Sequence, residues 1–405
     1  MARISRRRFI EFAGSTLATV GLSQLNIQRQ AESYGKVLAQ STPRKLALLV
    51  GINKYSFSPL EGCLNDVELQ RHLLIHRFGF NPKDIYTLTD EKATRQGILQ
   101  AFEEHLIRQA KPGDVVVYHY SGHGSRVVDP EPIFVSSSRD KSGLSGTFVP
   151  VDSTLPTGYP EQGGAVQDIM GHTLFLLMSA LKSENFTAVL DSCYSGAATR
   201  REFRVRARDG GNKVQISPEE KSYQDKWLSR LNLSREEFVK RYREGVAKGV
   251  VLAATNPTQT AADAWINGFH AGKFTYKLTQ YLWQQTSTPE SAIAYVVPNI
   301  PQDYNQTPRY EVKVGSGYEK KPIYFINTPS PATDAVITEV KGNQAKLWLG
   351  GVDLAAIDDG TVFSIINGNG KVTLRSREGL VGVATVEGVA KEGALLKAEG
   401  LSTGI

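Results

Sequence analysis

The chain has 405 residues, of which 22% are charged, and its formal net charge is +6 at pH 7. Residues 1–39 hold six basic and two acidic residues, so the rest of the chain carries only +2, and we infer no nucleic-acid-binding surface. No run of about 20 apolar residues is present, so we expect no membrane span in the mature chain. The length suggests two or three domains with enough chain for a large core.

Residues 1–39 are predicted to be an export signal. The Ser-Arg-Arg-Arg-Phe-Ile run at residues 5–10 resembles a twin-arginine signal, and a modest apolar stretch follows it at residues 12–25. The small-residue pattern at residues 37–39 predicts cleavage after Ala39. The alternative is an amphipathic tail that stays attached. We therefore expect a periplasmic or other extracytoplasmic protein, folded before export, whose two cysteines stay reduced.

Residues 44–327 alternate between strand and helix patterns, which predicts an α/β fold with a largely parallel sheet flanked by helices. The expected strands are 45–50, 84–88, 115–120, 187–190, 249–255 and 322–325, and the expected helices are 65–78, 94–110, 168–181 and 274–283.

Two of these strands end in polar turns that carry a histidine and a cysteine. The strand at 115–120 leads into His123, which has a glycine on each side, and the strand at 187–190 leads into Cys193. The carboxyl ends of parallel strands share one sheet edge, where α/β folds bind ligands. A histidine there can activate a thiol nucleophile. The alternatives are a structural thiol at Cys193 and, for His119 within the strand, a core position.

The motifs Tyr-Ser-Gly-His-Gly at 120–124 and Asp-Ser-Cys-Tyr-Ser-Gly at 191–196 together resemble the caspase-like (clan CD) cysteine peptidases, and most closely the metacaspases and orthocaspases. The resemblance extends over about residues 44–327. It implies catalytic His123 and Cys193, an oxyanion hole formed by the N–H groups of Gly124 and Cys193, and no metal or organic cofactor. Tyr194 departs from the pattern, because many metacaspases have histidine there.

The same resemblance implies an S1 pocket, the pocket for the residue before the cleaved bond (P1). Cys63 and Asp66 would line one side of it, and Ser121 and Asp191 the other. Two carboxylates in one partly dry pocket need a cation between them, which predicts protein or peptide substrates with Arg or Lys at P1 and disfavours Asp. Asp66 could instead be an acid favoured at a helix N-terminus. A legumain-like peptidase with another P1 preference is a second alternative.

The basic segment 201–248 is predicted to be a solvated, protease-sensitive linker, extended until a helix capped by Ser234. It would join a large part, 44–200, to a small part, 249–327, of the peptidase. We expect the enzyme to cut itself here, with Arg204, Arg206 and Arg208 as the best-exposed candidates. Residues 128–146 are predicted to be a surface loop.

Calcium is expected to have little or no effect. By resemblance, calcium-activated metacaspases have an aspartate about seven residues after the cysteine and an aspartate pair before the cysteine strand. Here the first position is Arg200, and at the second Asp168 precedes Ile169. A different oxygen-ligand site remains open, from Asp129, Asp140 and Asp152.

Residues 332–405 show short strand patterns between glycine-containing turns and no helical pattern, which predicts a small all-β barrel or sandwich. The segment holds no His or Cys, so we expect it to bind an unknown partner or to pack. The alternative for the whole chain is a non-catalytic exported scaffold whose β domain binds a partner. The expected strands are 335–340, 345–349, 361–366, 372–374 and 381–386.

Overall fold

The computed structural model describes residues 43–133, 143–193, 204–257 and 259–401. The chain divides into two compact units, Met1–Arg44 and Lys45–Ile405, and the second is described below. The expected export signal, Tyr194, Arg200 and Asp140 lie outside the described residues. Within those residues, no helix has both the length and the apolar character needed to cross a membrane.

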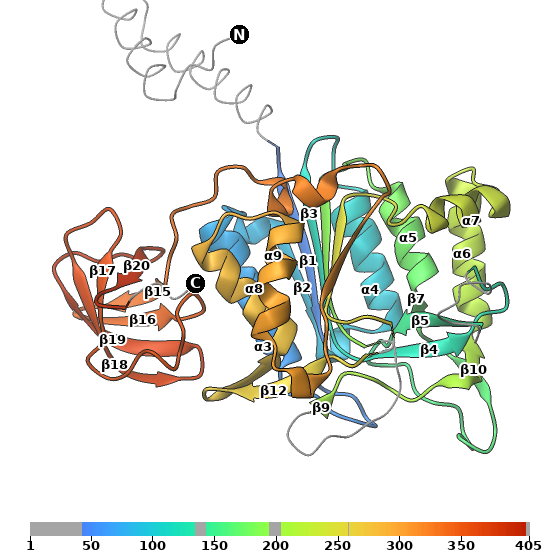
Figure 1. Ribbon diagram of the computed structural model, residues 1–405, viewed down its shortest axis with the longest axis horizontal. Coiled ribbons are helices and arrows are strands. Elements are labelled where there is room, and N and C mark those ends of the chain that lie inside the picture. Colours follow the sequence, from blue (N-terminus) through green and yellow to red (C-terminus); the bar gives the residue numbers. More distant parts are fainter. Residues whose placement is uncertain (1–42, 134–142, 194–203, 258, 402–405) are drawn as a thin grey trace, which may run out of the picture. The chain divides into compact units, whose positions relative to one another are not determined.

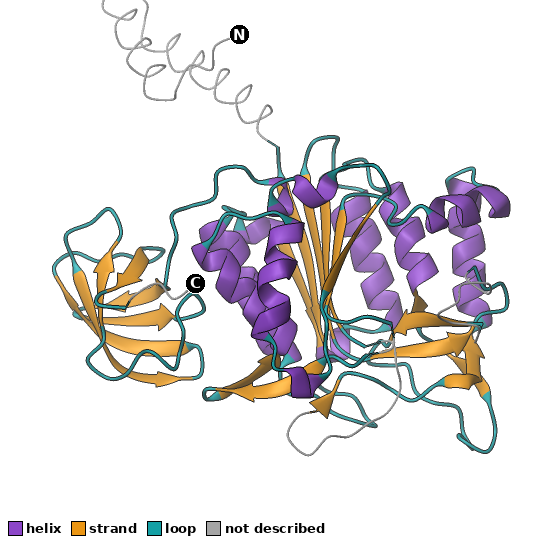
Figure 2. Ribbon diagram, in the orientation of Figure 1, coloured by secondary structure: helices purple, strands orange, loops and turns teal. Residues whose placement is uncertain are grey.

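A six-stranded sheet forms the centre of the unit (Figure 2), with the order β14-β11-β8-β3-β1-β2. All neighbours are parallel except β14, which is antiparallel to β11. Strands β3 and β8 are buried at every residue, as expected for apolar strands covered on both faces. The bounds are β1 (Lys45–Gly51), β2 (Ile85–Thr89), β3 (Val115–Ser121), β8 (Phe186–Asp191), β11 (Val250–Ala253) and β14 (Arg309–Val312).

Helices cover both faces of this sheet (Figure 1). Because side chains alternate along a strand, Ala47 and Leu49 of β1 face one apolar cluster, whereas Leu46 and Leu48 face the other. The first cluster lies under α3 (Cys63–His72), α8 (Lys273–Gln284) and α9 (Pro289–Val296). The second lies under α4 (Arg95–Ala101), α5 (Gly171–Ala180), α6 (Pro218–Arg230) and α7 (Arg235–Arg243). Wider π turns extend α3 and α4, at Leu73–Arg77 and Phe102–Ile107.

Two smaller sheets lie beyond the carboxyl ends of β3 and β8. One has the order β6-β10-β4-β5-β7 and the other β13-β12-β9. Strand β4 begins three residues after β3 ends, so the histidine turn directly connects the central sheet to the first of these smaller sheets. The bounds are β4 (Gly124–Val128), β5 (Leu144–Phe148), β6 (Gly164–Val166), β7 (Ile169–Met170), β9 (Arg204–Val205), β10 (Gly211–Ile216), β12 (Ala262–Ile266) and β13 (Phe269–Gly272).

The prediction of an extended linker is wrong for the described residues 204–248, because β9, β10, α6 and α7 lie within them. Helix α6 begins after Ser217, whose hydroxyl accepts from the Glu220 N–H at 3.2 Å. The expected cap at Ser234 is present and starts α7. Described residues at the two ends of the expected loop 128–146 belong to β4 and β5.

The strand expected at 322–325 is also wrong, since Ile323–Phe325 forms a 3₁₀ turn. Tyr324 and Phe325 have φ angles of 52° and 55°, which a strand does not allow. The remaining 3₁₀ turns are Pro82–Asp84, Asp90–Lys92, Val297–Asn299, Gln302–Tyr304 and Tyr318–Lys320.

The C-terminal strands form a closed antiparallel barrel in the order β15-β16-β19-β18-β17-β20. The barrel alternative is therefore confirmed, and closure leaves no exposed strand edge. Strand β20 was missed because it is short and contains Lys and Ala, which are depleted in strands. The bounds are β15 (Ala335–Lys341), β16 (Gln344–Trp348), β17 (Val362–Ile365), β18 (Lys371–Glu378), β19 (Val381–Glu387) and β20 (Leu395–Ala398).

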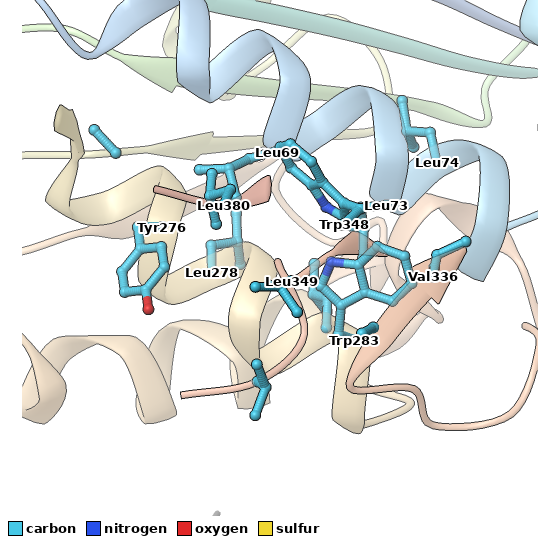
Figure 3. Close-up of a cluster of buried hydrophobic side chains, with 14 of the residues drawn as sticks. Leu69, Leu73, Leu74, Tyr276, Leu278, Trp283, Val336, Trp348, Leu349 and Leu380 are labelled. Atoms are coloured by element: carbon cyan, nitrogen blue, oxygen red, sulfur yellow. The ribbon is translucent and has the colours of Figure 1, made fainter. Parts of the chain in front are cut away.

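The barrel packs on α3 and α8 through a shared apolar cluster (Figure 3). Trp348 of β16 stacks on His72, with the ring centroids 4.1 Å apart. Gln284, at the end of α8, donates to Asp334 Oδ1 at 2.7 Å and to the Gly351 carbonyl at 2.7 Å. The barrel and the α/β part thus share one buried core.

Candidate active site

The histidine and cysteine turns meet at one edge of the central sheet. Ser121, the last residue of β3, lies opposite Asp191, the last residue of β8. Gly124 then approaches the cysteine turn so closely that a Cβ there would lie 1.7 Å from the Cys193 carbonyl oxygen. The glycine after His123 is therefore required for the two turns to touch.

His123 is buried and oriented by a backbone carbonyl. Its Nε2 lies 2.7 Å from the Ser58 oxygen, and because a carbonyl can only accept, Nε2 carries the proton. Nδ1 has no hydrogen-bond partner among the described residues, so it presents a free lone pair. The Tyr55 ring lies 4.5 Å from the imidazole, and the Tyr55 hydroxyl accepts from the His123 N–H. Burial lowers the pKa of His123 to about 4, so the ring is neutral at pH 7.

Cys193 is also fully buried. Its Sγ accepts from the Ala261 N–H at 2.7 Å. Burial raises the pKa of this thiol to about 12, so it is protonated in this conformation. The pair is therefore a neutral thiol and a neutral imidazole, and a nucleophilic thiolate requires proton transfer between them.

The carbonyl of Arg206 lies against the expected oxyanion hole. Its oxygen accepts from the Gly124 N–H at 3.0 Å and from the Cys193 N–H at 3.2 Å. The Arg206 N–H donates to the Ala261 oxygen at 3.0 Å. Two donors converging on one carbonyl next to a cysteine can stabilise the charge that develops on that oxygen during acyl transfer.

The chain before Arg206 adds a strand to a neighbouring sheet. In β9, Val205 pairs antiparallel with Ala262, and Arg204 pairs with Asp263. Strand addition is a common mode of extended-peptide recognition, since backbone hydrogen bonds fix the peptide whatever its side chains. This stretch of the chain is thus bound as a peptide would be.

The Arg206 side chain is fully buried among acidic groups. Nη1 lies 2.7 Å from Asp66 and 3.2 Å from Asp191, and Nη2 lies 3.3 Å from Asp263. Nη1 also donates to the Ser121 hydroxyl at 2.7 Å. Burial raises the pKa of Asp66 to about 7, and although the charge of Arg206 opposes this, Asp191 adds to it. A pocket with more carboxylates than cations strongly prefers a positively charged occupant.

Backbone donors hold these carboxylates in place. Asp66 accepts from the Gly272 N–H at 2.9 Å, and Asp191 accepts from the Thr275 N–H at 3.0 Å and from its hydroxyl at 2.7 Å. Asp263 accepts from the Glu61 N–H at 2.7 Å. None of these donors comes from Arg206, so the three carboxylates have fixed partners besides the occupant of the pocket.

The structure brings together all the residues expected to line S1. Cys63 is buried at the start of α3, and burial raises the pKa of its thiol, although the charge of Arg206 and the Ser121 hydroxyl oppose this shift. Asp263, however, was missed. It lies in a mostly apolar strand far along the chain, and an isolated acid between alanines was its only signal.

The expectation that Arg206 and Arg208 are well exposed is wrong, because the two residues are 0% and 2% exposed. Three carboxylates around Arg206 and the Asp168 carboxylate beside Arg208 explain the burial. Of the three candidates for self-cleavage, only Arg204 has an exposed side chain. His119 is buried within β3, as the core interpretation expects.

No group of three or more His, Cys, Asp or Glu in the described residues is arranged to hold a metal ion. Asp129 accepts from the Ser145 hydroxyl at 2.7 Å, and Asp152 accepts from the Arg95 N–H at 2.8 Å. Asp168 pairs with Arg208 at 2.7 Å.

Comparison with known families identifies the part of the chain that carries both turns. Residues 45–200 match the metacaspase, peptidase C14 domain. Over this part, the chain is similar to the metacaspases. This part is therefore a caspase-like C14 domain, from a family of cysteine peptidases, joined here to a C-terminal barrel.

Curated metacaspases resemble the chain over different lengths. Metacaspase-1 of Eremothecium gossypii is 26% identical over 67% of this chain, which spans 64% of that protein. Metacaspase-1 of Yarrowia lipolytica is 35% identical over 41% of this chain and 34% of that protein. A solved protein from Geobacter sulfurreducens is 21% identical, with a TM-score of 0.47 over 70% of this chain and 99% of that one, which is too distant to bear on function.

Proposed function

We propose that this protein is a cysteine endopeptidase that cleaves after Arg or Lys. The observation that carries the proposal is the bound state of Arg206, whose side chain fills the acidic pocket while its carbonyl meets the Gly124 and Cys193 N–H groups. Selection for P1 Arg or Lys follows from the three carboxylates, because an acidic or neutral P1 side chain leaves buried charge unpaired.

In the proposed mechanism, Cys193 attacks the carbonyl carbon of the P1 residue. The thiol proton passes to Nδ1 of His123, the nitrogen left free by the Ser58 contact, and then to the departing amine. The Gly124 and Cys193 N–H groups stabilise the oxyanion. Cleavage of the C–N bond leaves a thioester on Cys193, and water hydrolyses it to regenerate the thiol. No metal or organic cofactor takes part.

We further propose that the first substrate is the chain itself, cut between Arg206 and Ala207. The two products stay associated, because β8 on one side of the cut and β11 on the other pair in one sheet. Until the cut is made, Arg206 fills the S1 pocket and excludes other substrates. We also propose export through the twin-arginine-type signal, supported by residues 5–10.

A panel of fluorogenic peptides with P1 Arg, Lys, Asn or Asp tests this function, with Cys193→Ala as the control. We expect turnover of the Arg and Lys peptides only, and none by the variant. Preferred cleavage after Asn would favour a legumain-like specificity. Absence of turnover on every peptide by correctly folded protein would favour the non-catalytic scaffold.

A further inference from the structure

A second buried arginine follows Arg206 on the far side of the proposed cleavage site. Arg208 is the second residue after the Arg206–Ala207 bond, the P2′ position. Its N–H donates to the Gly124 oxygen at 2.9 Å, and Ala207 forms a β-bridge with Gly124. The chain is therefore fixed on both sides of the bond, with Arg208 in a defined place.

The Arg208 guanidinium occupies a small polar pocket of its own. Nη2 lies 2.7 Å from Asp168 Oδ2. Nη1 donates to the Ser153 hydroxyl at 3.1 Å and to the Ser153 carbonyl at 3.3 Å. Arg208 is 2% exposed, so these contacts are sheltered from water.

Asp168 is held in position by groups other than Arg208. It accepts from the Thr147 hydroxyl at 2.6 Å and from the Ser153 hydroxyl at 2.6 Å, and it is fully buried. A buried carboxylate is costly unless a cation accompanies it. When Arg208 leaves, the pocket therefore keeps its preference for a positive side chain.

The contact of Arg204, at the P3 position, differs in its exposure to water. Arg204 pairs with Glu61 at 2.6 Å, but the two side chains are 46% and 41% exposed. Solvent screens such a pair, and exposed ion pairs contribute little. P3 should therefore discriminate weakly, although the residue there is also an arginine.

We propose that Thr147, Ser153 and Asp168 form a specificity subsite for Arg or Lys at P2′. The proposal rests on the proposed function, since it adds a second recognised residue to the same cleaved peptide. The preferred substrate is then a peptide with one basic residue before the cut and another two positions after it.

Quenched peptides with a fixed P1 Arg and either Arg or Ala at P2′ test the subsite. The enzyme is Arg208→Ala, whose own chain cannot fill the subsite after self-cleavage. We expect kcat/KM to be about tenfold or more higher for P2′ Arg. The ratio should fall to about one when Asp168→Asn is added. Replacing P3 Arg by Ala should cost no more than about threefold.

Equal kcat/KM for the two P2′ peptides on the Arg208→Ala enzyme would overturn the subsite. An arginyl aminocoumarin, which has no amino acid beyond the cut, separates the two proposals: its hydrolysis alongside equal P2′ rates rejects only the subsite. If the wild-type protein, assayed alongside, also hydrolyses none of these substrates, the proposed function fails instead. Arg208→Gln replaces Arg208→Ala if the alanine variant does not fold.

Discussion

Helix α3 contributes to two buried clusters, one charged and one apolar. Near its N-terminus, Asp66 helps to surround a buried guanidinium with carboxylates, whereas Leu69 and Leu73 pack in the apolar cluster that joins α8 to the barrel (Figure 3). The charged pocket needs all its partners, because one missing group leaves a charge buried and unpaired. The apolar cluster loses stability in proportion to the volume removed. We therefore expect substitutions in the first to affect chemistry and those in the second to affect stability.

The largest expected effect on stability is at the barrel contact. Trp348→Ala removes a buried ring from β16, which should lower the free energy of unfolding by about 3–5 kcal/mol. Urea unfolding in a Cys193→Ala background measures this without self-cleavage. The control, Val381→Ala on the same barrel, removes an exposed side chain and should change stability by no more than about 0.5 kcal/mol. Similar losses for both variants would show that the barrel is not anchored through Trp348.

The acidic pocket should show the opposite pattern. Asp263→Asn should reduce kcat/KM for P1 Arg peptides by an amount equivalent to about 2–5 kcal/mol, because it removes one partner of a buried ion pair. Asp66→Ala and Asp191→Ala should behave similarly. Asp359→Asn, at an exposed acid of the barrel, is the matched control. An unchanged P1 Arg rate in Asp263→Asn would place the specificity pocket elsewhere.

Lowering the pH should also reduce the free energy of unfolding through His123, by less than the substitutions above. Burial lowers the pKa of His123 to about 4, below the value of about 6.5 expected in the unfolded chain. The unfolded state therefore takes up this proton first, and the stability that His123 contributes is present above pH 6.5 and lost as the pH falls towards 4.

Unfolding free energies of Cys193→Ala with and without His123→Asn isolate this effect. The protein that retains His123 should lose about 2 kcal/mol more between pH 7 and pH 4.5 than its partner. Parallel pH dependences for the two proteins would show that His123 is not buried in the uncut chain.

The sequence predicted that the histidine and cysteine turns meet at one sheet edge, because each turn follows an apolar strand and carries an unusual combination of residues. It could not predict Asp263, which reaches the pocket only through the pairing of β12 with β9 and β13. The sequence also could not predict that Arg206 and Arg208 are buried, since arginine is almost never fully buried unless paired. Helix α6 was not predicted, although Ser217 and Pro218 are a typical helix start from which it could have been.

We infer that Arg206 is bound as the P1 residue of the protein's own substrate. Mass spectrometry of purified wild-type protein, Cys193→Ala and His123→Ala tests it most directly. We predict a fragment that begins at Ala207 in the wild type, and intact chain across this bond in both variants. A fragment beginning at Ala207 in Cys193→Ala, or a wild-type protein that stays uncut between Arg206 and Ala207 after long incubation, would contradict the claim.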